Sequence, residues 1–217
     1  MTAAAPRGET RWAACASVVA VAVAQLLLPG QLLPGPNWML PAVEVLLVAG
    51  LLAADPNRLT VQSRDLRVFA LAIVGVVGAV NVATLVLLIH ELLNGGLSNG
   101  TELLGSAAVV WLTNVVVFGL LYWELDRGGP LARVGARPRH DRISLLFPQD
   151  SDPRIAPKGW RPSYGDYLFV SVTAATAFSP TDTMPLTHWA KALVGSQSLI
   201  SLATVGLVAA RAVNVLH

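Results

Sequence analysis

Hydroxyl side chains and one acid gather in a short run near the end of the chain. Residues 164–191 read YGDYLFVSVTAATAFSPTDTMPLTHWAK. Hydroxyl oxygens and freed backbone carbonyls can replace part of a cation's water shell, and a carboxylate adds negative charge. The candidate residues of such an ion path are Thr173, Thr176, Ser179, Thr181, Asp182 and Thr183. The alternative is an ordinary turn, in which Asp182 or Thr183 caps the helix that Pro185 opens.

The helix that leads into this run is short for a membrane span. A helix from Tyr164 to Phe178 would rise about 22 Å, whereas the hydrocarbon core of a bilayer is about 30 Å thick. It is therefore either a short span with a polar cap or a re-entrant half helix. The non-helical residues that follow, Ser179 to Thr183, would be tolerated at membrane depth only inside protein or along a water-filled cavity.

Ionisable side chains inside apolar segments form a second group of candidates. By helix rise, Glu44 lies about 9 Å and His90 about 5 Å from the outer ends of their predicted spans, so they could pair. With Glu91, Asp182 and His188 at the same face, they would form a cluster that binds a cation or relays protons. The alternative is that a single neighbour satisfies Glu44, while His90 and Glu91 are merely interfacial.

Three amide side chains also lie within apolar segments. Asn81 and Asn114 fall near mid-membrane, where an amide more often joins helices than binds a substrate. Gln197 belongs to a last segment that is richer in Gly, Ser and Thr than a lipid-facing helix should be. That composition predicts that this segment lies at the centre of the bundle or on an oligomer axis.

Six apolar segments must position these side chains. Hydrophobic residues make up 54% of the 217 residues and charged residues 13%, far from the roughly 25% charged residues of soluble proteins. The segments are residues 12–28, 38–54, 66–93, 103–124, 164–178 and 189–216. The sequence predicts an all-α integral membrane helix bundle with six membrane segments, five full spans and one short or re-entrant segment.

Basic residues predict the orientation of the bundle. They gather before the first segment, between the second and third, and in the connector after the fourth, while the alternate connectors carry no charge. Because Arg and Lys near span ends stay in the cytoplasm, we expect the N-terminus, the connector and the C-terminus on the cytoplasmic side of a cell membrane. The chain then divides into a four-helix part (1–125), an Arg- and Pro-rich connector (126–163) and a last part (164–217).

The connector is expected to be irregular and to lie near the lipid headgroups. Its prolines break helices, and its basic residues could attract anionic lipid at about 1 kcal/mol each. The alternative is that these residues only fix the orientation of the protein.

Residues 164–211 resemble the pore-loop and inner-helix region of potassium channels. The resemblance rests on an aromatic-rich half helix, paired threonines, Asp182, Pro185 three residues later, and a long helix after Trp189. It implies a pore loop. Where those channels carry Thr-Val-Gly-Tyr-Gly, this chain has TAFSPT from Thr176 to Thr181, with no glycine for a carbonyl-lined filter.

A second resemblance covers more of the chain, from about residue 103 to the end. This part is similar to a family of bacterial inner-membrane proteins of unknown function. The matching residues are Trp111, Phe118, Tyr122, Trp123, Phe147, Asp166, Tyr167, Leu168, Thr176, Phe178, Asp182 and Lys191. The resemblance implies a six-helix architecture and supplies no activity.

The motifs of common enzyme classes are missing from the sequence. It has no glycine-rich phosphate loop, no metal-ligand spacing and no serine elbow, and its one cysteine, Cys15, excludes an internal disulfide. We expect a protein that is not an enzyme, holds no cofactor or metal, and binds no nucleic acid. The leading hypothesis is a small homo-oligomeric pore or ion-translocating protein. The alternative is a membrane scaffold or regulatory protein that docks lipids or partners through its connector, and an enzyme at the outer face ranks third.

Overall fold

The computed structural model describes residues 12–33, 35–36, 38–54, 64–94, 100–135, 143–152, 154–157, 159–176 and 182–215. These residues are mostly helical, as the sequence predicts. Among them, three helical stretches are long and apolar enough to cross a membrane, namely Arg67–Asn94, Gly100–Gly128 and His188–Ala210. The described chain therefore has helices suited to a membrane protein.

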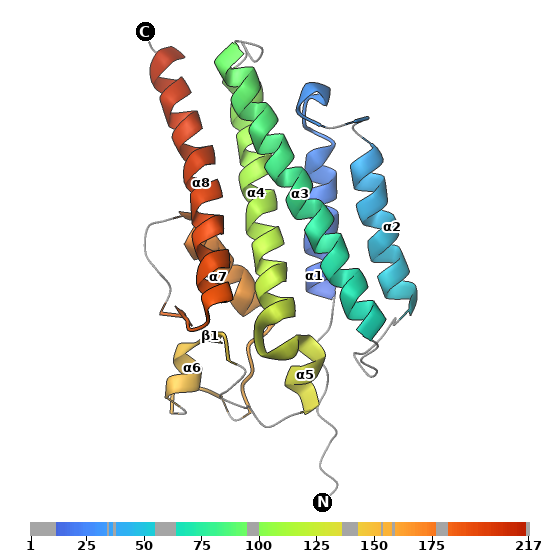
Figure 1. Ribbon diagram of the computed structural model, residues 1–217, viewed down its shortest axis with the longest axis vertical. Coiled ribbons are helices and arrows are strands. Elements are labelled where there is room, and N and C mark those ends of the chain that lie inside the picture. The colour runs from blue at the N-terminus through green and yellow to red at the C-terminus, as the bar shows by residue number, and fades with distance from the viewer. Residues whose placement is uncertain are drawn as a thin grey trace, which may run out of the picture.

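The first half of the chain forms four helices that alternate in direction (Figure 1). They are α1 (Trp12–Gln25), α2 (Met39–Ala54), α3 (Arg64–Asn94) and α4 (Gly100–Leu125), with the short 3-10 helix η1 (Gly30–Leu32) after α1. These bounds agree with the predicted segments to within a few residues. The agreement follows from composition, because an unbroken apolar run is long enough to form a stable helix and turn formers end it.

The second half of the chain contains shorter elements and one long helix. They are η2 (Asp126–Gly128), α5 (Pro130–Gly135), β1 (Leu145–Leu146), α6 (Pro148–Ser151), α7 (Tyr164–Thr176), β2 (Met184–Pro185) and α8 (His188–Val215). The connector is thus partly folded, and its described elements form a small layer below one end of the bundle (Figure 1). We call this the connector end.

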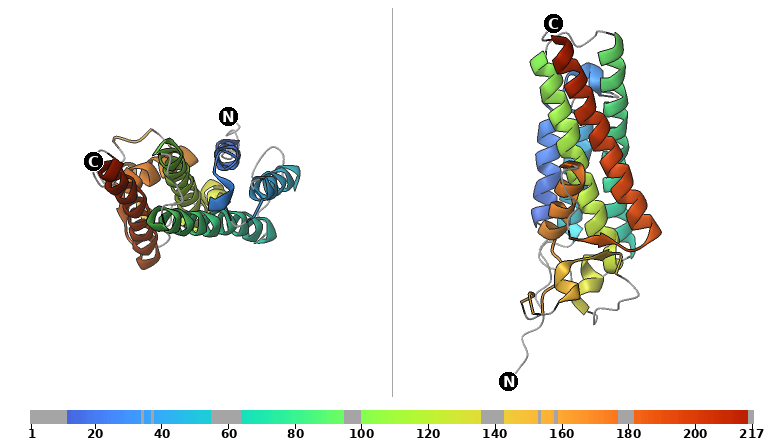
Figure 2. Two further views of the ribbon diagram at one scale, coloured as in Figure 1. Left: turned by 90° about the horizontal axis from the view of Figure 1, so that it is seen from above. Right: turned by 90° about the vertical axis from the view of Figure 1, so that its left-hand side faces the viewer.

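Helix α4 is the centre of the bundle. It packs against α1 and α3 on one side and against α7 and α8 on the other (Figure 2). Its candidate span is 72% buried, whereas that of α8 is only 17% buried. The core around α4 includes Tyr122, Trp123 and Tyr167, all almost fully buried. Helix α8 therefore lies at the edge of the single chain, although the sequence also allowed it a place at the bundle centre.

A sharp turn at the end of α4 directs the chain into the connector. Arg127, Gly128 and Gly129 all have positive φ angles, of 55°, 81° and 93°. A side chain at Gly129 would bring its Cβ to 3.1 Å from the carbonyl oxygen of Glu124. Glycine is the residue that takes this backbone conformation at low cost, so these two glycines allow α4 to end in a tight turn.

Two short strands tie the connector to the segment before α8. Strands β1 and β2 pair antiparallel, with Leu145 opposite Pro185 and Leu146 opposite Met184. The amide of Leu186 also donates to the carbonyl oxygen of Ser144 across 2.8 Å. The residues before α8 therefore lie at the connector end of the bundle.

Candidate functional site

Helices α7 and α8 run parallel to each other, which decides how the chain passes through the bundle. In α8, Gln197 donates to the carbonyl oxygen of Ser171 at 2.7 Å, and Ser198 donates to that of Ala174 at 3.2 Å. Residue numbers thus rise together along the two helices. Both helices begin at the connector end, so α7 cannot cross to the far end and return as α8.

Contacts between α7 and α4 lead to the same conclusion. The indole of Trp111 donates to the carbonyl oxygen of Ala175, and the hydroxyl of Ser171 donates to that of Val115 at 2.6 Å. Here numbers rise along one helix as they fall along the other, so α7 is antiparallel to α4. Helix α7 therefore begins at the connector end and ends at Thr176, part-way along the bundle. The next described residue, Asp182, lies at the connector end, just before β2. The last described residues before the gap and the first after it thus lie at different depths along the bundle, and α7 begins at the same end at which Asp182 lies.

This path differs from the one that the sequence predicts for the last part of the chain. The charge pattern predicts a C-terminus on the side of the connector, which requires two crossings after the connector. In the structure, α8 runs from His188 at the connector end to the opposite end of the bundle (Figures 1 and 2).

A buried polar cluster lies where α4, α7 and α8 meet. Gln197 is fully buried, and its side-chain oxygen Oε1 accepts from the hydroxyl of Tyr122 at 2.6 Å, while its side-chain amide nitrogen donates to Ser171. The side-chain amide of Asn114 donates to the hydroxyl of Ser201 at 2.8 Å and to the backbone carbonyl oxygen of Gln197. We call these five residues the Gln197 cluster. Two predicted candidates, Asn114 and Gln197, thus come together and join three helices.

Tyr122, Ser171 and Ser201, the other members of the Gln197 cluster, were not among the predicted site residues. Tyr122 lies eight residues after Asn114, so the two side chains share one face of α4. Ser201 lies four residues after Gln197 on α8 for the same reason. This spacing was a signal that could have identified the cluster. The third amide candidate, Asn81, is buried in α3 with 5% of its surface exposed.

The predicted ion-path residues are only partly brought together. The hydroxyl of Thr173 donates to the carbonyl oxygen of Val170 at 2.8 Å, and that of Thr176 donates to the carbonyl oxygen of Thr173 at 3.1 Å. Ser179 and Thr181 lie outside the described residues. Asp182 is exposed and Thr183 half-buried, and both precede β2 at the connector end.

A second buried cluster joins α4 to the connector. Asp126 is fully buried, and its Oδ1 accepts from the amides of Ser144 and Leu145 at 2.8 and 3.2 Å. Its Oδ2 accepts from the hydroxyl of Tyr167 at 2.6 Å and from Nε of Arg127 at 3.1 Å. One carboxylate thus holds β1, α7 and the turn after α4 together.

Two arginines of the connector have their charge inside this structure. The guanidinium of Arg127 also binds both carboxylate oxygens of Asp150. Arg133 is 94% buried, donates to the carbonyl oxygens of Trp123 and Asp126, and lies 5.0 Å from the ring centre of Tyr167. Both arginines therefore serve the fold rather than the lipid surface that the sequence suggested for the connector. Arg154, with a 90% exposed side chain, stays at the surface.

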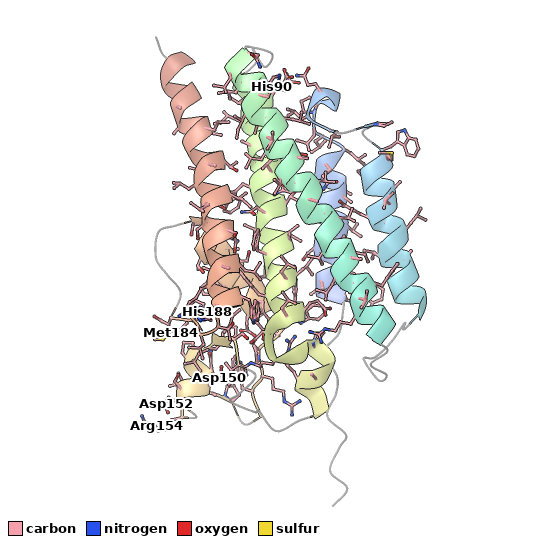
Figure 3. All side chains as sticks on the ribbon, viewed as in Figure 1. His90, Asp150, Asp152, Arg154, Met184 and His188 are labelled. Atoms are coloured by element: carbon pink, nitrogen blue, oxygen red, sulfur yellow. The ribbon has the colours of Figure 1, made fainter. Side chains whose placement is uncertain are left out.

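The expected cluster of acids and histidines does not form. Figure 3 shows His90 and His188 at opposite ends of the bundle. Asp182 and His188 lie at the connector end because α7 re-enters, whereas Glu44, His90 and Glu91 belong to the other end. Glu44 also has a different neighbour from the one expected: it accepts from the amide of Gln25 at 3.2 Å, and the ring of His90 is hydrogen-bonded to Asn94.

Fold and clusters define a helical bundle with three described helical stretches long and apolar enough to cross a membrane, one shorter helix, α7, and two buried polar clusters. Within the described residues, no three His, Cys, Asp or Glu side chains converge as a metal site would require. Comparison of the chain with protein-family models, with curated proteins and with solved structures gives no match.

Proposed function

We propose that this chain is a membrane protein of six membrane segments that forms a homo-oligomeric pore and conducts cations along α7. Helices α1 to α4 and α8 cross the bilayer, and α7 enters from the connector side and turns back. The proposal keeps the sequence-based division into five spans and one re-entrant segment. It is carried by one observation, the parallel hydrogen-bond register of α7 and α8.

Apolar side chains on the outside of the bundle support insertion into lipid. Leu46, Phe169 and Leu199 are 71%, 64% and 69% exposed, which is costly in water and favourable in hydrocarbon. Helices α1 and α2 have 14 and 16 residues, so they span about 21 and 24 Å. A bilayer accommodates such short helices by local thinning at a modest cost.

The end of α7 has the properties of a cation-binding position. The last carbonyl groups of a helix lack intrahelical partners and carry a partial negative charge, which favours a cation. In α7 this end lies part-way along the bundle, since Ala175 accepts a hydrogen bond from Trp111 near the middle of α4. Thr173 and Thr176 add hydroxyl oxygens that still have free lone pairs. Irregular backbone at such depth is tolerated where it lines a water-filled cavity, which fits a pore.

The cation path must lie on the outer side of α7 and α8. Neighbouring copies of the chain must therefore enclose it, so the pore is an oligomer. The inner side, where both helices meet α4, is closed by the Gln197 cluster, whose central side chain has no exposed surface. The outer side of α8 carries exposed small residues such as Gly195, Ser196 and Gly206. Small residues let helices of neighbouring copies approach closely in a membrane.

Basic residues support an orientation with the connector in the cytoplasm. At this end Arg133 is buried and Arg127 is partly buried, yet Arg154 and Lys191 are exposed there, and the opposite end has uncharged connectors. The re-entrant segment then opens to the cytoplasm, and the end of α8 lies outside the cell. We place the protein in a bacterial inner membrane on the basis of the family resemblance of residues 103–217.

Ion flux into lipid vesicles tests this function. We expect purified wild-type protein to admit monovalent cations, and Asp182→Asn to reduce the flux because it removes a negative charge beside the re-entrant segment. Asp152→Asn is the matched control, since Asp152 is also an acid of the connector end but belongs to a surface pair with Arg154. Equal fluxes for all three proteins, no greater than that of empty vesicles, would contradict a pore.

The alternative function, a membrane scaffold, makes the opposite prediction. A scaffold would leave the vesicles sealed, and the purified protein would bind anionic vesicles more strongly than neutral ones through its connector. The burial of Arg127 and Arg133 reduces the charge available for such docking, which is why we prefer the pore.

A further inference from the structure

Two buried side-chain oxygen atoms, one on α1 and one on α2, have no hydrogen-bond donor. The amide nitrogen of Gln25 donates to Oε1 of Glu44 at 3.2 Å. The other oxygen of the carboxyl group, Oε2, has no partner, and neither has Oε1 of Gln25. The amide of Gln25 and the carboxyl group of Glu44 share one hydrogen bond, and each keeps one acceptor oxygen without a donor.

Both side chains are almost completely inaccessible. Glu44 has no exposed surface and Gln25 has 3%. An unpaired carboxylate buried away from water is very unfavourable, and a buried acceptor without a donor also costs free energy. A single proton removes both problems, because it neutralises Glu44 and supplies the missing donor.

Charged neighbours do not offer another solution. Helix α2 packs against α1 and α3. In the described part of α1 the one titratable side chain is Cys15, ten residues before Gln25 and about 15 Å away along the helix. The intervening η1 has the sequence GQL and carries no titratable group.

Helix α3 contributes Arg67, His90 and Glu91 among the side chains that the structure describes. Arg67 belongs to the connector end, where it donates to the carbonyl oxygen of Glu124. His90 is exposed and is hydrogen-bonded to Asn94. Glu91 is half-buried, and a second acid could only favour the neutral form of Glu44 further.

We propose that Glu44 and Gln25 form a proton-binding site between α1 and α2. The proton resides on Oε2 of Glu44 and is donated to Oε1 of Gln25, so acid and amide are joined by two reciprocal hydrogen bonds. Hard metal cations take about six oxygen ligands or more, whereas this pair offers two. The ligand of the site is therefore a proton. The site is separate from α7, and its existence does not depend on the pore.

An apolar carbodiimide is a direct probe of a protonated carboxyl group in a membrane. Dicyclohexylcarbodiimide partitions into lipid, and its central carbon is attacked by the carboxyl oxygen while the carboxyl proton moves to one of its nitrogens. The adduct rearranges to a stable acylurea that peptide mass spectrometry locates. We expect it on Glu44 of the vesicle-embedded protein at about pH 8, where an exposed glutamate, with a pKa of about 4.3, is ionised.

Glu102 is the control acid of the same chain. It is exposed in the first turn of α4, at the end of the bundle to which Glu44 also belongs. We expect a water-soluble carbodiimide at about pH 5 to label Glu102 and to spare Glu44. Labelling of both acids with the same pH dependence would overturn the proposal. Protection of Glu44 by sodium ions at constant pH would also overturn it, because the ligand would then be a metal cation.

Infrared spectroscopy tests the hydrogen bond between the two side chains independently of labelling. We expect wild-type protein at about pH 7 to show the carbonyl band of a protonated carboxyl group, and Glu44→Gln, which keeps the shape of the side chain, to abolish it. In Gln25→Met the band should move to higher frequency, because the carboxyl group loses its partners. A wild-type spectrum without the band, or a band that Gln25→Met does not move, would contradict the site.

Discussion

Tyr167 in α7 donates a hydrogen bond to the buried carboxylate of Asp126 at the end of α4, with 2.6 Å between Oη and Oδ2. This contact fixes the first half of α7 to the turn that follows α4. Phe147 of the connector packs on the same tyrosine ring, with the two ring centres 5.4 Å apart. The first half of α7 is thus held at Tyr167 by Asp126 after α4 and by Phe147 of the connector.

Removing this hydroxyl should destabilise the protein. We expect Tyr167→Phe to lower the free energy of unfolding by about 1–3 kcal/mol, because Oδ2 of Asp126 loses a donor in a buried environment. Thermal unfolding in detergent measures the loss. Ser163→Ala, which removes an exposed hydroxyl at the start of α7, should cost less. Equal melting temperatures for Tyr167→Phe and the wild type would mean that the contact contributes nothing.

The Gln197 cluster should be energetically coupled. Gln197→Met removes the acceptor of Tyr122 and the donor to Ser171 while it keeps the length of the side chain. In a double-mutant cycle with Tyr122→Phe we expect a coupling free energy of about 0.6–1.7 kcal/mol, the range for hydrogen bonds between membrane helices. Ser196→Ala on the exposed side of α8 is the control. Strictly additive effects of Gln197→Met and Tyr122→Phe would show that the bond is not formed.

The buried and exposed arginines of the connector should differ sharply. Arg127→Ala leaves Asp126 and Asp150 without their cation, and breaking such a buried pair costs about 3–5 kcal/mol. Arg154→Ala should leave the melting temperature unchanged, because its pair with Asp152 is exposed and screened. The same melting temperature for both variants would mean that the Arg127 network is not formed in the membrane.

Arg154 should nevertheless affect the titration of Asp152. Hydrogen bonds from the side chain and then the backbone of Arg154 lower the pKa of this carboxyl group below its ordinary value. Any stabilisation from the pair is present above the ordinary pKa and is lost as the pH falls through the lowered one. We expect the pKa of Asp152, measured by carboxyl-carbon NMR, to rise in Arg154→Ala, and an unchanged titration would argue against the pair.

Labelling of introduced cysteines tests the path of the chain. In a Cys15→Ala background, we expect Arg154→Cys and Met184→Cys to react from the same side of the membrane, since β2 pairs with the connector. Ala210→Cys, near the end of α8, should react with an impermeant maleimide from the opposite side. If Ala210→Cys and Arg154→Cys react from one side, α7 crosses the membrane and the re-entrant path is wrong.

The lengths of the helices could be predicted from sequence, but the direction of α7 could not. Apolar runs such as residues 103–124 and 189–216 correspond closely to α4 and α8, because composition alone sets how long a helix can stay in an apolar environment. A helix of intermediate length, from Tyr164 to Thr176, is compatible with crossing or returning. The direction of α7 follows from its hydrogen-bond register with α8, which Ser171 and Gln197 establish. Contacts between residues so far apart in the chain leave no periodic pattern in the sequence.

The partner of Glu44 was missed for a related reason. Helix rise gave the depth of Glu44 and of His90, and depth says nothing about which side of a helix a residue occupies. Gln25, at the end of α1, is the actual neighbour. The ion pair of Arg127 with Asp150 was equally hidden, because 23 residues separate them and the intervening prolines indicated an irregular segment.

The pairing of β1 with β2 creates a mechanical link between the connector and the start of α8. Leu146 and Met184 are far apart in sequence, yet backbone hydrogen bonds make them neighbours four residues before α8 begins. A force applied to the connector at β1 would therefore be transmitted directly to the start of α8 through these backbone hydrogen bonds.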